Sequence, residues 1–167
     1  MTSEREIFLI RAYLGVGSNL GDRLQNLNSA RVRVTGLEGV RFLRASSVYE
    51  SDPVGGPPQG KYLNAVWEIE TDLTAETLLG HLQTIERDLG RERLVPNGAR
   101  TLDLDLLFYG DQIFETGFLT VPHPRLHERF FTLVPLMELS PDLRHPKQGK
   151  TIRRLFEEHR ENLSKSV

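Results

Sequence analysis

The stretch Arg100-Thr-Leu-Asp103-Leu-Asp105-Leu-Leu-Phe-Tyr-Gly110 reads as a β-strand that carries two carboxylates. Side chains in a strand alternate between its two faces, so residues two positions apart point the same way. We therefore expect Asp103 and Asp105 to share one face. The other face is expected to direct Leu102, Leu104 and Leu106 into a core.

Two neighbouring acids in a buried strand require a counter-charge, because they repel each other and are costly to remove from water. A divalent cation would supply that charge. Oxygen-only ligands favour Mg²⁺ over Zn²⁺, and Mg²⁺ in phosphate chemistry usually takes one or two carboxylates together with water and phosphate oxygens. Arg100, three residues before Asp103, is placed to neutralise a phosphoryl oxygen.

The alternative is that the Asp-x-Asp pair is only the solvated face of an amphipathic strand, and the spacing by itself does not separate the two interpretations. The residues that follow favour a functional pair. Leu107-Phe108-Tyr109 is a continuous apolar run, which predicts burial on both faces of the strand. Charges without a function would be expensive there.

The length and composition predict one domain spanning residues 1–167, with residues 1–6 and 161–167 frayed. The formal net charge is −2 with 26% charged residues of both signs, which gives no footprint for a dedicated nucleic-acid binder. There is no Cys, so disulfides, thiolate metal sites and a Cys nucleophile are excluded. The N-terminus resembles neither a signal peptide nor a membrane span, so a soluble cytoplasmic protein is the default expectation.

Hydrophobic periodicity predicts an alternating order of strands and helices. Strands are expected at 8–16, 40–49 and 62–71, within the stretch 100–110, and at 112–121, with a possible edge strand at 141–146. Helices are expected at 22–35, 74–89, 125–139 and 151–158. Pro135 predicts a kink in the third helix or its division into two pieces.

Three irregular segments separate these elements. The glycine turn 17–22 is not a P-loop, because no Gly-Lys-Ser/Thr follows, and a simple strand-to-helix turn explains it best. Residues 51–60 contain three prolines and three glycines, which fits a linker, a flap or a binding loop. Residues 91–100 carry three arginines toward the Asp pair, and such a loop can fold over a polyphosphate.

Tyr62 and Asn64 are expected on one face of the strand that follows the proline-rich loop. An aromatic ring and a carboxamide two residues apart can bind a flat heterocycle. On the residues alone, an ordinary strand surface is the preferred interpretation. His123 lies between two prolines and, as a lone histidine, is more often structural than catalytic.

Four motifs, in this order along the chain, resemble 6-hydroxymethyl-7,8-dihydropterin pyrophosphokinase, an enzyme family of folate biosynthesis. They are Gly15-Val-Gly-Ser-Asn-Leu-Gly-Asp22, the proline-rich loop with Tyr62-Leu-Asn64-Ala, Arg100-Thr-Leu-Asp-Leu-Asp105, and Leu119-Thr-Val-Pro-His123-Pro. The resemblance extends from Tyr13 to about Pro146. It implies transfer of the pyrophosphoryl group of ATP to the hydroxymethyl group of a dihydropterin, with release of AMP. It also implies an α+β ferredoxin-like layered fold, a mostly antiparallel sheet with helices packed on it.

The resemblance assigns roles to particular residues. Asp103 and Asp105 would bind two Mg²⁺ ions, and Arg91 and Arg100 would act in catalysis. ATP would be contacted by Gln83, Glu86, Arg93, Leu106, Thr120, His123 and Arg129. The pterin would be bound by Ser51, Val54, Tyr62, Asn64 and Phe131, with its ring between Tyr62 and Phe131. The protein is expected to act as a monomer on small molecules, without nucleic acid or membrane.

This chain departs from the family pattern at three places. Pro96-Asn97 stands where many members have Arg-Trp, Asp52 where Pro is common, and Phe118 where some members have an Arg toward ATP. These changes affect the expected nucleotide clamp rather than the metal site.

The residues by themselves are also compatible with two other functions. A two-metal phosphodiesterase or nuclease would need further acidic ligands and a basic groove. A ferredoxin-like regulatory or nucleic-acid-binding module would bind without Mg²⁺.

Overall fold

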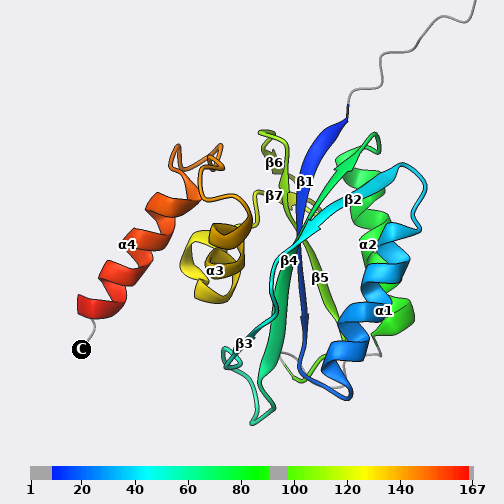
Figure 1. Cartoon of the computed structure of the whole chain (residues 1–167), viewed down its shortest axis with the longest axis horizontal. Helices are drawn as coiled ribbons and strands as arrows, with labels where there is room; N and C mark the ends of the chain where they lie inside the picture. The colour runs from blue at the N-terminus through cyan, green and yellow to red at the C-terminus, as the bar shows by residue number, and fades with distance from the viewer. Residues whose placement is uncertain (1–8, 91–97, 166–167) are drawn as a thin grey trace, which may run out of the picture.

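The computed structural model describes residues 9–90 and 98–165 and has an antiparallel sheet at its centre (Figure 1). The long strands are β1 (Ile10–Ser18), β2 (Val40–Ala45), β4 (Tyr62–Thr71) and β5 (Asp103–Tyr109), in the order β2-β4-β1-β5. A short strand, β3 (Tyr49–Ser51), also pairs with β4. This arrangement confirms the α+β fold expected from the sequence.

One face of the sheet is covered by α1 (Arg23–Thr35) and α2 (Ala75–Leu89), which lie side by side in Figure 1. Each helix begins where its capping residue predicts. The side chain of Asp22 accepts a hydrogen bond from the Gln25 N–H, and that of Thr74 accepts one from the Thr77 N–H. Below these helices lies a core that includes Leu102, Leu104 and Leu106, as the alternation of β5 predicted.

The opposite face carries α3 (Phe130–Leu139), with α4 (Ile152–Lys165) packed outside it (Figure 1). A second core joins these helices to the sheet through buried residues that include Leu107, Phe108, Leu133 and Ile152. The end of β5 is therefore buried on both sides, which confirms the interpretation of its apolar run.

Several predicted elements are wrong in extent. The strand predicted at 40–49 ends at Ala45, and β3 begins at Tyr49. The segment 112–121 is a small hairpin of β6 (Phe114–Glu115) and β7 (Thr120–Val121), because Thr116 closes a turn through three hydrogen bonds with Leu119. The helix predicted at 125–139 is divided at Arg129 into η1 (Leu126–Glu128) and α3, while Pro135 lies inside α3.

The C-terminal region is more regular than expected. In place of an edge strand, 141–146 forms turns with one isolated bridge between Arg144 and Thr151. The last helix, predicted to end near Glu158 before a frayed tail, continues to Lys165. Its buried Ile152 and Leu155 hold it to the second core, and ion pairs such as Lys150–Glu158 support its first turns. None of the helices in the described ranges is long and apolar enough to span a membrane.

Candidate active site

A cavity of about 600 Å³ opens on the α3 side of the sheet. Its walls come from β1, β4, β5, the loop after β3, the η1–α3 region and α4. Ten residues predicted for the site line it: Ser51, Val54, Tyr62, Asn64, Arg100, Asp103, Asp105, His123, Arg129 and Phe131. The fold thus brings together residues from five separate segments of the chain.

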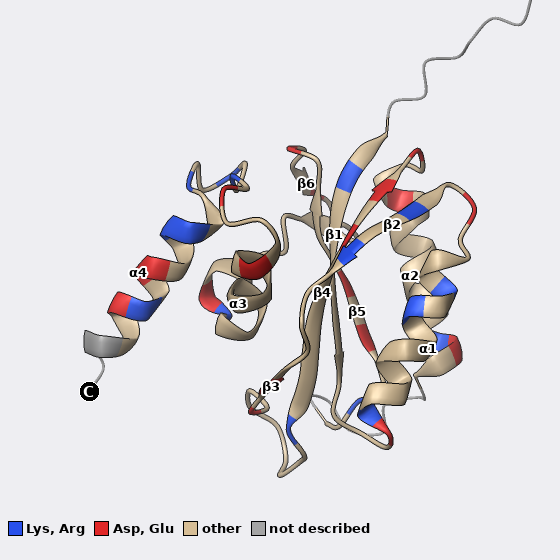
Figure 2. Cartoon of the chain, in the orientation of Figure 1, with Lys and Arg blue, Asp and Glu red and all other residues tan. Residues whose placement is uncertain are grey.

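The Asp pair lies on the cavity side of β5, as the alternation predicted, and Figure 2 shows acidic positions along this strand. On the neighbouring strand β1, Gly17 pairs with Asp103 and Gly15 with Asp105. A Cβ at Gly17 would lie 3.3 Å from Asn64 Oδ1, and one at Gly15 would lie 3.3 Å from Leu107 Cδ2. The two glycines therefore keep the floor beside the carboxylates open.

Arg100 is held next to the Asp pair at both its backbone and its side chain. Its Nη1 donates to Asp103 Oδ1 at 2.6 Å. Its backbone N–H donates to Asn19 Oδ1 at 2.7 Å, and its carbonyl accepts from the Asn19 N–H at 3.0 Å. The Asn19 side chain also donates to Gln59 Oε1 and the Gly60 carbonyl, so the glycine turn fixes Arg100 and the proline-rich loop together.

Asp105 lies in a buried and negatively charged environment. Burial raises the pKa of Asp105 to about 6, and the nearby charges of Asp103 and Glu86 act in the same direction. Glu86 reaches this region from α2 and accepts a hydrogen bond from the Leu104 N–H at 2.9 Å. The site therefore concentrates negative charge and favours the arrival of a cation.

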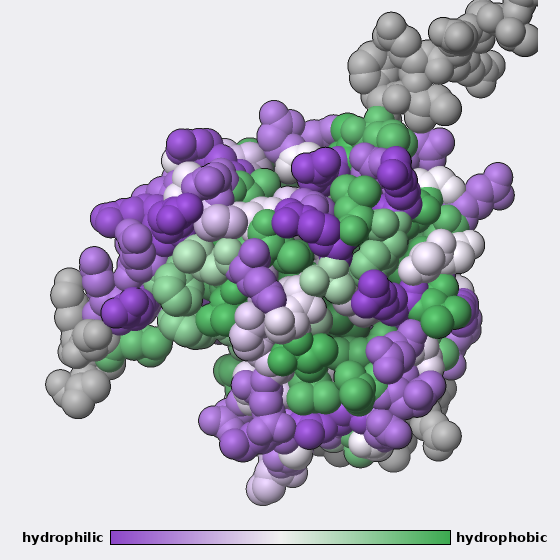
Figure 3. Space-filling model, in the orientation of Figure 1, coloured by the Kyte–Doolittle hydropathy of each residue, from purple (hydrophilic) through white to green (hydrophobic). Residues whose placement is uncertain are grey.

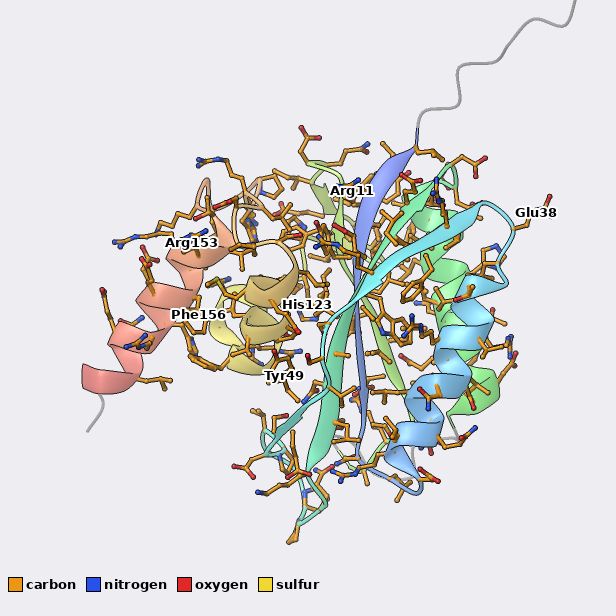
Figure 4. All side chains as sticks on the ribbon, viewed as in Figure 1. Arg11, Glu38, Tyr49, His123, Arg153 and Phe156 are labelled. Carbon is orange, nitrogen blue, oxygen red and sulfur yellow. The ribbon has the colours of Figure 1, made fainter. Side chains whose placement is uncertain are left out.

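His123, which is labelled in Figure 4, lines the same cavity. Arg129, directly before α3, lines it as well. Burial lowers the pKa of His123 to about 4, helped by the charges of Arg129 and Arg125. The imidazole is consequently uncharged near neutral pH and can accept or donate a hydrogen bond. The two arginines add positive charge to the cavity wall.

The predicted ring-binding residues also gather in the cavity. Asn64 is almost fully buried, and its Nδ2 donates to Ser51 Oγ at 2.6 Å. The guanidinium of Arg129 lies over the Phe131 ring, 5.6 Å from its centre. Tyr62 and Phe131 both face the cavity, so an aromatic surface and a carboxamide are available to one ligand.

The remaining predicted residues lie elsewhere. Gln83 is exposed on α2, Thr120 is exposed on β7 and Leu106 is buried in the first core, and none of the three lines the cavity. Arg91 and Arg93, together with Pro96-Asn97, lie outside the described residues. Of the other departures, Asp52 lines the cavity, whereas Phe118 is exposed beyond β6.

Sequence reasoning missed part of the wall. Phe130, His159 and Leu163 line the cavity, and the last two come from α4, beyond Glu158, near which that helix was predicted to end. Gln59, Arg125 and Glu128 were also missed. The sequence signal for α4 was an amphipathic pattern that continues past Glu158, with Phe156, His159 and Leu163 three or four residues apart.

The antiparallel sheet and its acid-floored cavity define an α+β protein with a built small-molecule site. The chain belongs to the 7,8-dihydro-6-hydroxymethylpterin-pyrophosphokinase (HPPK) family, whose model matches residues 13–141.

Curated relatives agree with this membership. The 2-amino-4-hydroxy-6-hydroxymethyldihydropteridine pyrophosphokinase of Synechocystis sp. is 44% identical over 147 residues, which cover 88% of this chain and 75% of the relative. The enzyme of the same name from Haemophilus influenzae is 44% identical over 135 residues, covering 81% and 84%. The folic acid synthesis protein fol1 of Pneumocystis carinii is 41% identical over 93% of this chain, which spans only 21% of that longer protein.

Solved structures show the same fold. An HPPK-DHPS in complex with substrates superposes with a TM-score of 0.73 at 13% identity, covering 93% of this chain and 44% of that one. The wild-type Plasmodium falciparum HPPK-DHPS with pteroate gives a TM-score of 0.73 at 13% identity, covering 98% and 44%. The chain therefore spans less than half of these two solved proteins.

Proposed function

We propose that this chain catalyses the Mg²⁺-dependent transfer of pyrophosphate from ATP to the hydroxymethyl group of 6-hydroxymethyl-7,8-dihydropterin. The products would be AMP and the pterin diphosphate, an intermediate of folate biosynthesis. The observation that carries this proposal is the shared cavity, which unites Asp103 and Asp105 with Tyr62 and Asn64. Family membership and the names of the two bacterial relatives supply the substrate class.

The donor set fits magnesium. Asp103 and Asp105 are oxygen ligands in a site where burial and like charge raise the pKa of Asp105, so a divalent cation would relieve both penalties. Within 9–90 and 98–165, no group of three or more His, Asp or Glu side chains could hold a metal ion. Two carboxylates would therefore share the metal with water and phosphate oxygens, as Mg²⁺ sites commonly do. Bound there, two Mg²⁺ ions would neutralise phosphate charge and acidify the substrate hydroxyl.

The reaction is an in-line displacement at phosphorus. The hydroxymethyl oxygen would form a bond to the β-phosphorus of ATP, and the bond from that phosphorus to the α,β-bridging oxygen would break. That oxygen leaves with AMP, and the hydroxyl proton passes to solvent. Because phosphoryl transfer depends mainly on positioning and charge, Arg100 and Arg129 would orient and stabilise the phosphates.

The pterin would be bound by the sheet side of the cavity. Tyr62 and Phe131 offer ring faces, and Asn64, fixed by Ser51, offers hydrogen bonds to a heterocycle edge. Val54 and Ser51 would complete this wall. The same proposal includes nucleotide contacts by Gln83, Glu86, Leu106, Thr120 and His123. It also gives Arg91 and Arg93 a role in a loop over the phosphates. We further propose that the protein acts as a single-domain monomer in the cytoplasm.

The experiment that tests this function is an end-point assay for AMP with ATP and the dihydropterin, with and without Mg²⁺. We expect AMP and pterin diphosphate in equal amounts, and none when Mg²⁺ is removed. A phosphodiesterase would release products without the pterin, and a binding module would release none. An Asp103→Ala variant that stays folded and converts the substrates at a near-native rate would also contradict the mechanism.

A further inference from the structure

The C-terminal helix α4 forms part of the wall of the substrate cavity although it lies outside the residues that match the family model. Its first turns are fixed. Ile152 and Leu155 are buried in the second core, and Arg153 pairs with Asp142 at 3.1 Å. The helix therefore projects from a rigid base past the start of α3, where Figure 1 shows it lying beside that helix.

An aromatic cluster joins α4 to the cavity. The Phe130 ring, at the start of α3, has its centre 5.1 Å from that of Phe156 and 5.1 Å from that of His159, each at an interplanar angle of 44°. Figure 4 shows Phe156 on the side of α4 that faces α3. Phe130 also lines the cavity and directly precedes Phe131, so α4 braces the backbone that carries a predicted ring-binding residue.

The second half of α4 contributes side chains to the cavity wall. Among the described residues of α4, His159 and Leu163 line the cavity. Leu163 is 51% exposed, so a large apolar side chain faces solvent at this wall. Figure 3 shows a hollow between α4 and the β3 end of the sheet, with hydrophobic residues gathered along it.

These features suit a ring better than a phosphate. An imidazole, a phenyl ring and an isobutyl group offer stacking and apolar contact. Arg100, which suits a phosphate, and the carboxylates, which suit a cation, come instead from β5 and its approach. Arg125, directly before η1, and Glu128 of η1 also line the cavity. The ring of the nucleotide is the competing occupant.

We propose that His159 and Leu163 of α4 contact the pterin ring and contribute to selection of that substrate. This inference rests on the proposed function for the identity of the ring. It adds the C-terminal helix to the binding wall formed by Tyr62, Asn64 and Phe131.

The test compares His159→Ala and Leu163→Ala with the wild type in steady-state assays. We expect the KM for the pterin to rise roughly three- to tenfold, which corresponds to loss of one ring or apolar contact. The KM for ATP and the kcat should stay within about twofold, because a contact equal in ground and transition states changes KM alone. His159→Phe keeps a ring face and should restore the wild-type KM. Glu161→Ala, at an exposed position between the two, is the matched control.

Three results would overturn the proposal. They are an unchanged pterin KM in both alanine variants, a rise in the ATP KM in place of the pterin KM, and a His159→Phe enzyme that behaves like His159→Ala. Calorimetric titration with the pterin, with folding checked by circular dichroism, repeats the comparison without turnover. An inactive wild type that still binds the pterin through these residues would refute the proposed reaction while leaving this contact intact.

Discussion

The Nη1 atom of Arg100 lies 2.6 Å from Oδ1 of Asp103, so the cation expected to act on phosphate is paired with an expected metal ligand. Both side chains are largely buried, with exposures of 24% and 19%. A bound cation and a triphosphate would compete for the two partners, and Arg100 would exchange one anionic oxygen for another. The pair keeps the guanidinium positioned within the site, which would lower the cost of reorganisation in the proposed reaction.

Arg100→Ala is expected to reduce kcat by roughly a hundredfold to a thousandfold, because one preorganised charge donor is lost where negative charge develops. The Kd for the pterin should change little. Single-turnover measurement of AMP formation separates the chemical step from product release. Arg33→Ala, which removes an exposed arginine paired with Asp88, is the control and should have no effect. An Arg100→Ala enzyme with normal kcat would remove Arg100 from the mechanism.

Asp105→Asn is expected to stabilise the metal-free protein at pH 7 while abolishing activity. The pKa of Asp105 is raised from 3.8 to about 6 by burial, Asp103 and Glu86. A raised pKa gives a stability contribution that is present below pH 3.8 and is lost as pH rises through about 6. The variant avoids that loss, so its free energy of unfolding at pH 7 should increase by roughly 1 to 3 kcal/mol.

Denaturant unfolding at pH 7 and pH 4 tests the Asp105 prediction. The free energy of unfolding of Asp105→Asn should exceed that of the wild type at pH 7. The difference should nearly vanish at pH 4, where Asp105 is protonated in the native wild type. Added Mg²⁺ and ATP should stabilise the wild type and not the variant. A variant that is less stable than the wild type at pH 7 would show that Asp105 is not under electrostatic strain.

The local features of this fold could be predicted because they depend on neighbours in the sequence. Strand alternation placed Asp103 and Asp105 on one face, and the capping residues Asp22 and Thr74 placed the starts of α1 and α2. The open floor beside the acids could not be predicted, because it depends on the register that sets Gly15 and Gly17 opposite them.

Contacts distant in sequence account for the rest. Glu68 is only 2% exposed in β4, where its carboxylate accepts hydrogen bonds from Tyr13, 55 residues away, and from Arg44. Burial by itself would raise the pKa of Glu68, but these hydrogen bonds outweigh it and the pKa is lowered. In the sequence, Glu68 resembles any polar residue of an alternating strand. The cavity wall from α4 was missed for the same reason, since it forms only when Phe130 meets His159.

His145 is expected to make the protein sensitive to mild acid. Burial lowers its pKa from 6.5 to about 4, with a contribution from the charge of His127, and its Nδ1 accepts hydrogen bonds from the Lys147 and Gln148 N–H groups. A lowered pKa gives stability that is present above pH 6.5 and is lost as pH falls through about 4. The loss should approach about 3 kcal/mol at pH 4.

His145→Asn keeps an acceptor for the two N–H groups and removes the titration. Its free energy of unfolding should be lower than that of the wild type at pH 7, because the ring contact with Phe108 is lost, but should fall less between pH 6.5 and pH 4. The exposed His81→Asn is the control and should follow the wild type. Asp105 and His123 titrate in the same pH range. The contribution of His145 is therefore isolated by comparing, between variants, how steeply the free energy of unfolding changes with pH. If the free energy of unfolding changed with pH equally in the wild type and His145→Asn, the assignment of acid sensitivity to His145 would be refuted.

Glu138 joins two walls of the cavity and is expected to act on pterin binding through them. From α3, its carboxylate accepts hydrogen bonds from Ser47 N–H at 2.8 Å, Ser47 Oγ at 2.6 Å and Tyr49 Oη at 3.0 Å. Tyr49, labelled in Figure 4, lies on β3, which ends at Ser51, and Phe131 lies in the first turn of α3. The bridge therefore links the two elements that carry these proposed pterin contacts. Glu138→Ala should raise the KM for the pterin about threefold to tenfold, because two or more hydrogen bonds to a charged group are lost.

The KM for ATP and the kcat should be nearly unchanged in Glu138→Ala, since Asp103, Asp105 and Arg100 come from β5 and its approach. Glu138→Gln retains an acceptor for Ser47 and should recover most of the pterin affinity, and Tyr49→Phe, which removes one of the hydrogen bonds, should give an intermediate KM. A general loss of stability would lower activity toward both substrates equally. It would not make the KM for the pterin rise in the order Glu138→Gln, Tyr49→Phe, Glu138→Ala. An ungraded series, or an equal rise in both KM values, would mean that Glu138 supports the fold without positioning the pterin wall.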